Sequence, residues 1–250
     1  MKVIIIISFY LLLTYSVQVV SASEPFIQSA IEHKDRTATD VQSDSFRKPA
    51  EILTFFKVQA QTTVLDVLAG SGYYSEILSH AVGEQGKVII HNDKHFLKYY
   101  GDPLSDRLGD TNRLVNAERL DISLNDLQLE ENSVDTIFLI LGFHDFYYIM
   151  DESEKIDVKK VLANFRKFLK PNGIVGIVDH DAKQGAPSTV GGNLHRIDSQ
   201  IVINEMLKAG FELDGELTIF KKPMDIKAIK IWDVPREERS RFILRFRNKK

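Results

Sequence analysis

The sequence predicts an α/β protein built on a doubly wound, mostly parallel sheet of seven strands that ends in an antiparallel strand pair. Two observations predict this fold class. Apolar runs of strand length alternate along the chain with segments of helical periodicity. In addition, four runs are continuously apolar, which is typical of strands in a parallel sheet with helices on both faces. These four runs contain Val64, Val88, Val134 and Ile174.

The expected helices and strands follow in chain order. We expect a first helix at 46–56, because Pro49 suits a helix start and the apolar residues after it form one face. A region of mixed pattern follows the expected strand at 87–91 and ends at Asp121. The expected strands are 63–68, 87–91, 134–141, 174–179, 211–218 and 241–247, and the expected helices between them are 74–82, 156–169 and 199–209.

The last two expected strands have no helix between them. The segment that joins them holds Pro223 and Pro235 and is too irregular for a crossover helix. A parallel pair needs such a crossover, so we expect these two strands to pair antiparallel.

The amino terminus has the pattern of an export signal. A lysine precedes an apolar run at 3–13 that continues more weakly to Val20, and Val20 and Ala22 suit the −3 and −1 positions of a cleavage site. We therefore expect residues 1–22 to be a cleaved signal peptide and the mature protein to be periplasmic. An uncleaved anchor is the rival interpretation, because the apolar stretch approaches the ~20 residues that span a bilayer.

The rest of the chain is expected to form a polar arm and one domain. Residues 23–45 are polar and charged, which predicts a lead-in arm with at most short helices. Residues 46–250 have the length of a single α/β domain with a full core.

The composition argues against two classes of function. The chain has 32 basic and 35 acidic residues, so no strong field favours a nucleic-acid partner. It has no cysteine, which excludes thiol nucleophiles and zinc–thiolate sites. We expect a small-molecule substrate.

The most informative stretch is VLDVLAGSGYY at 64–74, where an apolar run breaks into a Gly-Ser-Gly turn. Gly70 and Gly72 lack the Cβ atoms that would block a ligand, and Asp66 places a carboxylate beside the same crevice. An ordinary strand-turn-helix connection is one alternative. A dinucleotide-binding loop is another, because GSGYYS approaches the pattern G-x-G-x-x-G.

Further segments follow in the order GKVII, ENSVDTIFLILGFHDFYY, LANFRKFLKPNGIVGIVDH and EMLKAGFEL, before the closing strand pair. In the LKPNG turn, Pro171 is expected to end a helix and Gly173 to take the turn before the next strand. From about Arg47 onward, this order resembles the class I S-adenosylmethionine-dependent methyltransferases. The export signal and the segments RKPAEIL, HDFYY and SRFILRF are similar to an exported bacterial group of predicted methyltransferases. The resemblance implies a Rossmann-like methyltransferase fold, S-adenosylmethionine as cofactor, and methyl transfer to an unidentified small molecule.

The resemblance also implies a set of cofactor-binding residues. The family's glycine-rich loop falls on 66–72, and Leu68 stands where the family has its first glycine, so its side chain narrows the space for the methionine part of the cofactor. Asn92 takes the place of the acidic residue that holds the ribose hydroxyls, and Asp121 stands near the adenine-contacting position. The expected cofactor-binding residues are Asp66, Ala69, Gly70, Ser71, Gly72, Asn92, Asp93 and Asp121.

Candidate catalytic groups follow the ends of neighbouring strands. His144 and Asp145 come directly after one expected strand, and His195 and Arg196 come after a loop rich in small residues. Methyl transfer from a sulfonium needs an aligned nucleophile and a base for its proton. We expect one of the two histidines to be the base, with Asp145 or Asp179 orienting it. Arg196 is expected to hold an anionic group of the substrate.

A metal site is a second hypothesis for the same strand ends. The groups that offer nitrogen and oxygen ligands are His144, Asp145, Asp179, His180 and Asp181. Their spacing is not a recognised ligand motif, so the sequence prediction names no metal ligand. The alternative function is an exported protein of this fold that binds a small ligand or a metal without methyl transfer, or that is purely structural.

Overall fold

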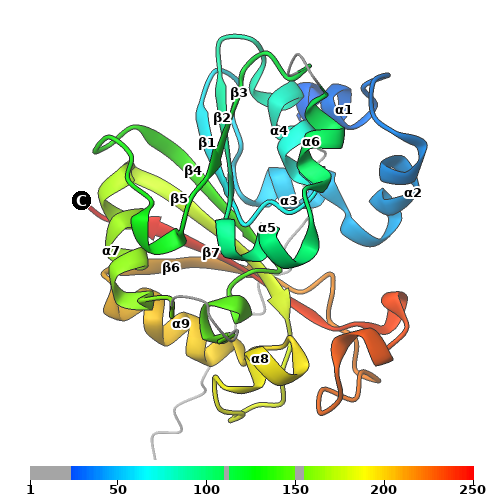
Figure 1. The fold of residues 1–250 in the computed structure, drawn as a ribbon, viewed down its shortest axis with the longest axis vertical. Helices are drawn as coiled ribbons and strands as arrows, with labels where there is room; N and C mark the ends of the chain where they lie inside the picture. The colour runs from blue at the N-terminus through cyan, green and yellow to red at the C-terminus, as the bar shows by residue number, and fades with distance from the viewer. Residues whose placement is uncertain (1–23, 110–112, 150–154) are drawn as a thin grey trace, which may run out of the picture.

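The computed structural model describes residues 24–109, 113–149 and 155–250 of the chain (Figure 1). The predicted signal peptide lies outside these residues. None of the helices described has the length and apolar character of a bilayer-spanning segment.

A seven-stranded sheet forms the centre of the molecule, with strand order β3-β2-β1-β4-β5-β7-β6. The first five strands in the chain run parallel, and β7 pairs antiparallel with both β5 and β6. The predicted fold class is confirmed, including the antiparallel final pair. The strands are β1 (Thr63–Val67), β2 (Lys87–Asn92), β3 (Ala117–Asp121), β4 (Val134–Ile140), β5 (Leu169–His180), β6 (Phe211–Leu217) and β7 (Arg241–Asn248).

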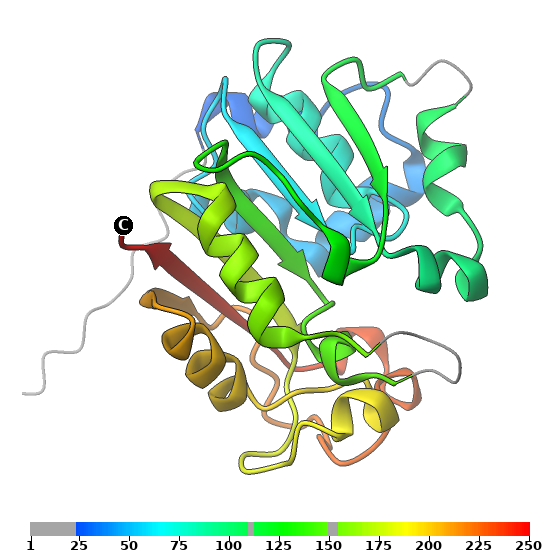
Figure 2. The same cartoon turned by 60° about the vertical axis from the view of Figure 1, so that its left-hand side comes forward.

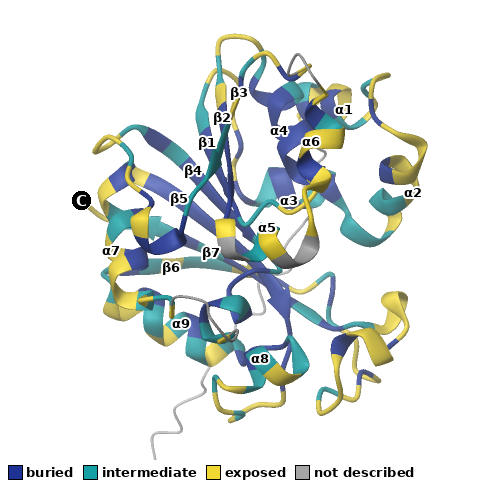
Figure 3. Ribbon diagram, viewed as in Figure 1, coloured by how far each residue is buried: buried dark blue, intermediate teal, exposed yellow. Residues whose placement is uncertain are grey.

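Helices cover both faces of this sheet (Figures 1 and 2). Val64 of β1 packs in the core on one face and the next residue, Leu65, packs in the core on the other, which is why the strands are apolar without alternation. Figure 3 shows the resulting buried strands at the centre of the molecule. On the first face lie α1 (Pro25–Ile31), α3 (Pro49–Phe55), α4 (Tyr73–Val82) and α6 (Pro103–Leu108), and on the second lie α7 (Val158–Phe168) and α9 (Ser199–Lys208).

The remaining described helices are α2 (Ala38–Arg47), α5 (Lys94–Tyr100) and α8 (Val190–Leu194). Side-chain caps start several helices where the sequence changes from loop to helix. Thr37 accepts a hydrogen bond from the Asp40 amide at the start of α2, and Asp198 accepts one from the Gln200 amide at the start of α9. Ile27 and Ala30 of α1 are buried in the main core, so the polar arm is packed against the domain.

The LKPNG turn differs in detail from the sequence prediction. The residue in the left-handed region is Asn172, with φ 63°, rather than Gly173. A Cβ atom on Gly173 would lie 3.0 Å from the Asp135 carbonyl oxygen, so the glycine is required for space. The turn interrupts the pairing of β4 with β5, because Val134 pairs with Leu169 and Thr136 pairs next with Ile174.

Candidate active site

The turn after β1 is open at Gly70 and closed at Gly72. Both glycines lie in the left-handed region, with φ 60° and 76°. A Cβ atom on Gly70 would meet no atom within 4 Å, whereas one on Gly72 would lie 2.7 Å from the Leu104 side chain. Gly70 therefore offers bare backbone to a ligand, and Gly72 allows close packing of α6.

Asn92 fixes this turn from the end of the neighbouring strand. Its Oδ1 accepts from the Gly70 amide at 2.8 Å, and its Nδ2 donates to the Gly70 carbonyl at 3.0 Å. An aspartate could not make the second bond, since a carboxylate has no hydrogen to donate. The amide keeps one N–H and one lone pair for another partner, so it can still bind a hydroxyl group.

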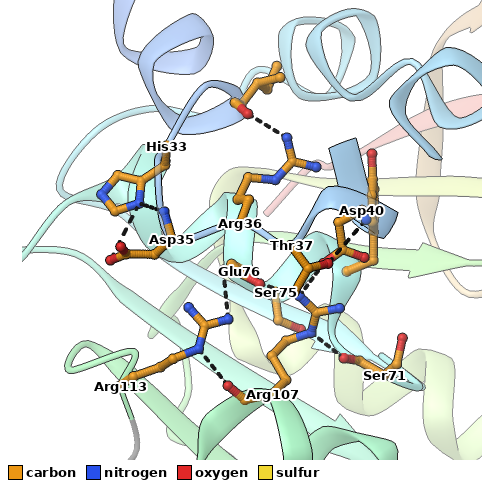
Figure 4. A network of polar contacts seen from close by, with 12 residues as sticks. His33, Asp35, Arg36, Thr37, Asp40, Ser71, Ser75, Glu76, Arg107 and Arg113 are labelled. Carbon is orange, nitrogen blue, oxygen red and sulfur yellow. Dashed lines mark hydrogen bonds and ion pairs between the residues drawn. The ribbon is translucent and has the colours of Figure 1, made fainter. Parts of the chain in front are cut away.

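Arg107 of α6 ties the same turn to two helices (Figure 4). Its guanidinium donates to the Ser71 carbonyl and to the buried Glu76 of α4, and it pairs with Asp40 of α2 at 2.6 Å. Arg113 pairs with Glu76 at 2.7 Å, so the two arginines balance the two carboxylates of Glu76 and Asp40. This network was not predicted, because nothing local in the sequence brings these distant residues together.

Asp66 lies beneath the turn and is fully buried. Its Oδ2 accepts from the Ser75 hydroxyl at 2.6 Å. Burial raises the pKa of Asp66 to about 7, and the hydrogen bond from Ser75 offsets only part of that shift. The carboxyl group lines a hollow of about 190 Å³ that Tyr73, Tyr74 and Arg47 also line.

Leu68 and Leu141 are held in the left-handed region, with φ 53° and 58°. This conformation is costly for a branched side chain and is typical of functional sites. Both leucines line the smaller hollow and also a larger cavity beside it. The Leu68 side chain packs against Gly142, where an added Cβ atom would lie 3.1 Å from Leu68 Cδ1. The two leucines thus form the partition between the two spaces.

The larger cavity, of about 360 Å³, lies beyond the carboxyl ends of the parallel strands. This is the usual position of ligand sites in doubly wound sheets, and the volume is in the range of small-molecule sites. It is lined by Leu68, Gly70, Asn92, Phe96, Leu97, Gly101, Pro103, Leu141, His144, Asp145, His180, His195, Ile231 and Trp232.

His144, Asp145 and His195 meet at one wall of this cavity. Asp179, at the end of β5, accepts from the His144 backbone amide at 2.9 Å and lies 2.8 Å from His144 Nδ1. His144 Nε2 then lies 3.2 Å from His195 Nδ1 and 3.3 Å from Asp145 Oδ1. The structure therefore brings together three of the predicted catalytic residues, and Asp179 is in place to orient His144.

Helix α8 carries His195 to this wall. Its Gly191 lies so close to the loop after β4 that an added Cβ atom would be 2.5 Å from the His144 carbonyl oxygen. His195 ends α8 in the left-handed region, with φ 49°. Its ring lies 4.9 Å from the Trp232 ring and 5.5 Å from the Tyr148 ring, so two aromatic side chains hold its orientation.

The pKa values separate the two histidines. Burial lowers the pKa of His144, but the charges of Asp179 and Asp145 outweigh it and raise that pKa to about 9. Burial and the charge of His144 lower the pKa of His195 to about 4. Burial raises the pKa of Asp145 to about 6. At neutral pH, His144 therefore carries the positive charge, His195 is neutral, and Asp145 is mostly ionised.

The structure does not bring Arg196 to the site. Its guanidinium is fully buried, pairs with both carboxylate oxygens of Asp225 at 2.8 and 2.9 Å, and donates to the carbonyls of Asp181 and Ile229. These partners hold the guanidinium inside the protein. The expectation that Arg196 holds an anionic substrate group does not fit this placement, since its charge is already neutralised.

Three of the expected cofactor residues, Gly72, Asp93 and Asp121, also lie away from the cavity lining. Asp93 accepts from the Leu124 amide at 2.7 Å and so anchors the loop after β3. Asp121 pairs with Arg119 at 2.6 Å, and its Oδ1 is buried without a partner among the described residues. Of the remaining expected residues, Asp66, Ala69, Gly70 and Ser71 line the smaller hollow and Asn92 lines the larger cavity.

One part of the cavity wall comes from outside the parallel strands and was not predicted from the sequence. Ile231 and Trp232 lie in the connection between β6 and β7 and line the cavity. A usable signal was present, since Trp232 is the single tryptophan of the chain and stands in the mixed basic and apolar run KAIKIW. Phe96 and Leu97 of α5 contribute to another side.

Comparisons with known proteins agree with this architecture. A model of the methyltransferase domain matches residues 65–177, and a model of protein-L-isoaspartate(D-aspartate) O-methyltransferases matches residues 23–98. A comparison with curated proteins finds no match.

Solved structures show the same fold at low sequence identity. A SAM-dependent methyltransferase from Aquifex aeolicus superposes with a TM-score of 0.57 at 23% identity, over 88% of this chain and 97% of the other. An S-adenosylmethionine-dependent methyltransferase from Mesorhizobium loti superposes with a TM-score of 0.52 at 13% identity, over 78% of this chain and 95% of the other.

The strand order, the glycine turn after β1 and the cavity at the strand ends define a Rossmann-like methyltransferase fold. The methyltransferase domain match over residues 65–177 makes the chain similar to the S-adenosylmethionine-dependent methyltransferases and supports S-adenosylmethionine as its cofactor. The donor set fits this cofactor. Gly70 leaves open space, Asn92 keeps hydrogen-bonding capacity for a sugar hydroxyl, and the buried Asp66 can balance a positive charge.

The buried carboxyl of Asp66 should give the protein a measurable pH dependence of stability. Between pH 4 and pH 7 the unfolded chain loses this proton while the folded protein keeps it, so the free energy of unfolding should fall as pH rises. The fall should be at most about 4 kcal/mol, at 1.36 kcal/mol per pH unit. Urea unfolding across this range should show a steeper fall in the wild type than in Asp66→Asn, which keeps the contribution of other groups such as Asp145. Asp214→Asn, on β6, should keep the slope, and parallel profiles for wild type and Asp66→Asn would contradict the assignment.

Proposed function

We propose that the protein transfers a methyl group from S-adenosylmethionine to a small molecule bound in the larger cavity. The single observation that carries this proposal is the position of the His144, Asp145 and His195 cluster. It lies on the wall of a cavity that also reaches Gly70 and Asn92 of the cofactor turn. Donor and acceptor can therefore meet in one space without a large movement of the sheet.

The cofactor would be held by the turn after β1 and the end of β2. Gly70 leaves open space at the turn, Asn92 offers its free N–H and lone pair to sugar hydroxyls, and Asp66 faces the positive charges of the amino acid part. When bound, S-adenosylmethionine supplies an electrophilic methyl group on a sulfonium. The chain supplies alignment, which can account for most of the rate of such a transfer.

The cluster supports the acceptor and takes its proton. His144 donates its Nε2 hydrogen to His195 Nδ1, so the Nε2 atom of His195 carries a hydrogen. This atom has no partner among the described residues and can donate to an acceptor oxygen or nitrogen. The Asp145 carboxylate, beside both rings, is then the group that removes the acceptor proton. These assignments exchange the roles expected from the sequence, in which a histidine was the base.

Leu68 should limit cofactor affinity, because its side chain lies between the two cavities and occupies space that the cofactor would need. Leu68→Gly removes both the side chain and the strained leucine backbone, and Leu68→Ala removes only the bulk. Ordering one such side chain costs about 0.5 to 1.5 kcal/mol, so both variants should bind S-adenosylmethionine roughly 2- to 10-fold more tightly in calorimetry. Weaker or unchanged binding would show that the partition does not obstruct the cofactor.

Methyl transfer should depend on Asp145. With methyl-labelled S-adenosylmethionine and the low-molecular-mass fraction of a cell extract, the wild type should form a labelled product and S-adenosylhomocysteine. Loss of the base in Asp145→Asn should lower the rate by about 10² to 10⁴-fold without weakening cofactor binding. Asp214→Asn is the matched control and should retain the wild-type rate. Cofactor binding without labelled product in the wild type would refute the proposal.

We further propose that residues 1–22 direct export and that the protein acts in the periplasm, on the strength of the apolar run and the small residues at Val20 and Ala22. Amino-terminal sequencing of the protein recovered from the periplasm of a bacterial host should begin at Ser23. Recovery in the membrane fraction with the leader intact would instead support the anchor interpretation.

A further inference from the structure

We propose that His144, Asp145 and His195 form a binding site for one Zn²⁺ ion, open toward the larger cavity. The proposal rests on three ligand atoms that converge on one point. His144 Nε2, His195 Nδ1 and Asp145 Oδ1 lie on three sides of this point, 3.2, 3.3 and 3.9 Å from one another. Among the described residues, this is the group of metal-ligating side chains whose atoms come this close together.

The spacing of the three atoms matches the size of the ion. The circumradius of a triangle with sides of 3.2, 3.3 and 3.9 Å is about 2.0 Å, so one point lies at that distance from all three atoms. Zinc binds nitrogen and carboxylate oxygen at about 2.0 to 2.2 Å. The ion would therefore fit with little movement of the three side chains.

Hydrogen bonding alone explains this arrangement less well. His144 Nε2 can offer a single hydrogen, yet it faces both His195 Nδ1 and Asp145 Oδ1 at similar distances. A Zn²⁺ ion at the common point, bound with release of the His144 Nε2 proton to solvent, satisfies all three atoms together. The same ion gives a shared partner to His195 Nδ1 and Asp145 Oδ1, which lie 3.9 Å apart and are too distant to hydrogen-bond to each other.

Asp179 holds His144 as a metal ligand requires. The buried carboxylate accepts from the Nδ1 side of His144 at 2.8 Å and from the backbone amides of His144 and His180 at 2.9 and 2.7 Å. A histidine whose other nitrogen donates to a fixed carboxylate has its tautomer and ring orientation set for binding a metal through Nε2. Asp179, one of the possible ligands named from the sequence, would thus contact a ligand of the ion instead of the ion itself.

The third ligand is delivered by close packing of α8. Gly191 lets that helix contact the His144 backbone, and the left-handed backbone at His195 turns its ring back toward His144. Such a conformation is uncommon in a non-glycine residue and persists where the surroundings impose it. Here it places His195 Nδ1 at the common point.

The ligand set selects the kind of ion. Two imidazoles and one carboxylate suit Zn²⁺ and related transition metals, whereas Mg²⁺ prefers oxygen ligands in an octahedron. Three protein ligands leave a further coordination position, as in catalytic zinc sites. That position faces the cavity, so an acceptor with an oxygen or nitrogen donor would bind the ion directly, with Asp145 as a ligand instead of the base. This last consequence rests on the proposed methyl transfer; the metal site itself does not.

The experiment uses the full chain without an affinity tag, stripped with EDTA and dialysed. Calorimetric titration with Zn²⁺ should show one equivalent bound, and Mg²⁺ should show none. His195→Ala should weaken zinc affinity at least ~100-fold, since it removes one of three ligands. His80→Ala, which removes a histidine stacked on His33 away from the cavity, is the matched control and should leave the affinity unchanged.

Two variants test the support of the site without removing a ligand. Asp179→Asn should weaken zinc binding about 10- to 100-fold, as loss of such a partner does in other sites. Gly191→Ala should displace α8 and should therefore also weaken zinc binding. Circular dichroism checks that each variant is folded, and Co²⁺ substitution gives a visible absorption band that reports the coordination directly. In the wild type this band should appear with one equivalent of Co²⁺ and be lost in His195→Ala.

No stoichiometric Zn²⁺ binding in the wild type, or binding that survives His195→Ala unchanged, would overturn the proposal. S-adenosylmethionine binding, measured on the stripped protein, separates this outcome from failure of the proposed function. A protein that binds the cofactor but no zinc would refute the metal site alone, and one that binds zinc but no cofactor would refute the methyltransferase proposal alone.

Discussion

The buried carboxylate of Asp179 is the contact on which the site depends. It lies at the end of β5 and bonds both the backbone and the ring of His144, which belongs to the loop after the neighbouring strand β4. One side chain therefore fixes the relative position of two strand ends and the orientation of a histidine. His195 and Asp145 are then arranged around an imidazole that cannot rotate. Without this contact, the cluster would be three separate loop residues.

The sequence predicts the sheet well because the physical signal is local. Strands buried on both faces must be apolar throughout, and Pro223 and Pro235 rule out a crossover helix between the last two strands, so the parallel central strands and the antiparallel final pair follow. Strand β3 at the sheet edge was not predicted, because its sequence AERLD has no apolar run and only its first residue is buried. The convergence of His144, Asp145 and Asp179 follows from the same logic, since the carboxyl ends of parallel strands share one edge. Site residues carried by strand ends were therefore predictable.

Residues whose role depends on long-range partners were not predictable. Arg196 adjoins His195 in the sequence, but its buried partner Asp225 lies in the connection between β6 and β7, and only the folded chain shows the pair. Asn92 was expected to bind a ligand, but its carboxamide already accepts one hydrogen bond from the Gly70 amide and donates one to the Gly70 carbonyl. Asp93 lies one position past the end of β2 and holds the loop after β3 by accepting from the Leu124 amide. Adjacent residues thus have unrelated tasks, and composition or spacing does not separate them.

The wall formed by Ile231 and Trp232 has a consequence for how such a protein can diversify. The wall belongs to the connection between β6 and β7, at the antiparallel edge of the sheet. Asp179 instead lies near the end of β5, and His144 lies in the loop after β4. Exchanges at Ile231 would reshape the chamber while Asp179 and His144 keep their contacts. Trp232 and Asp225 in the same connection support His195 and Arg196, so this peripheral loop shapes the cavity and also steadies one member of the cluster.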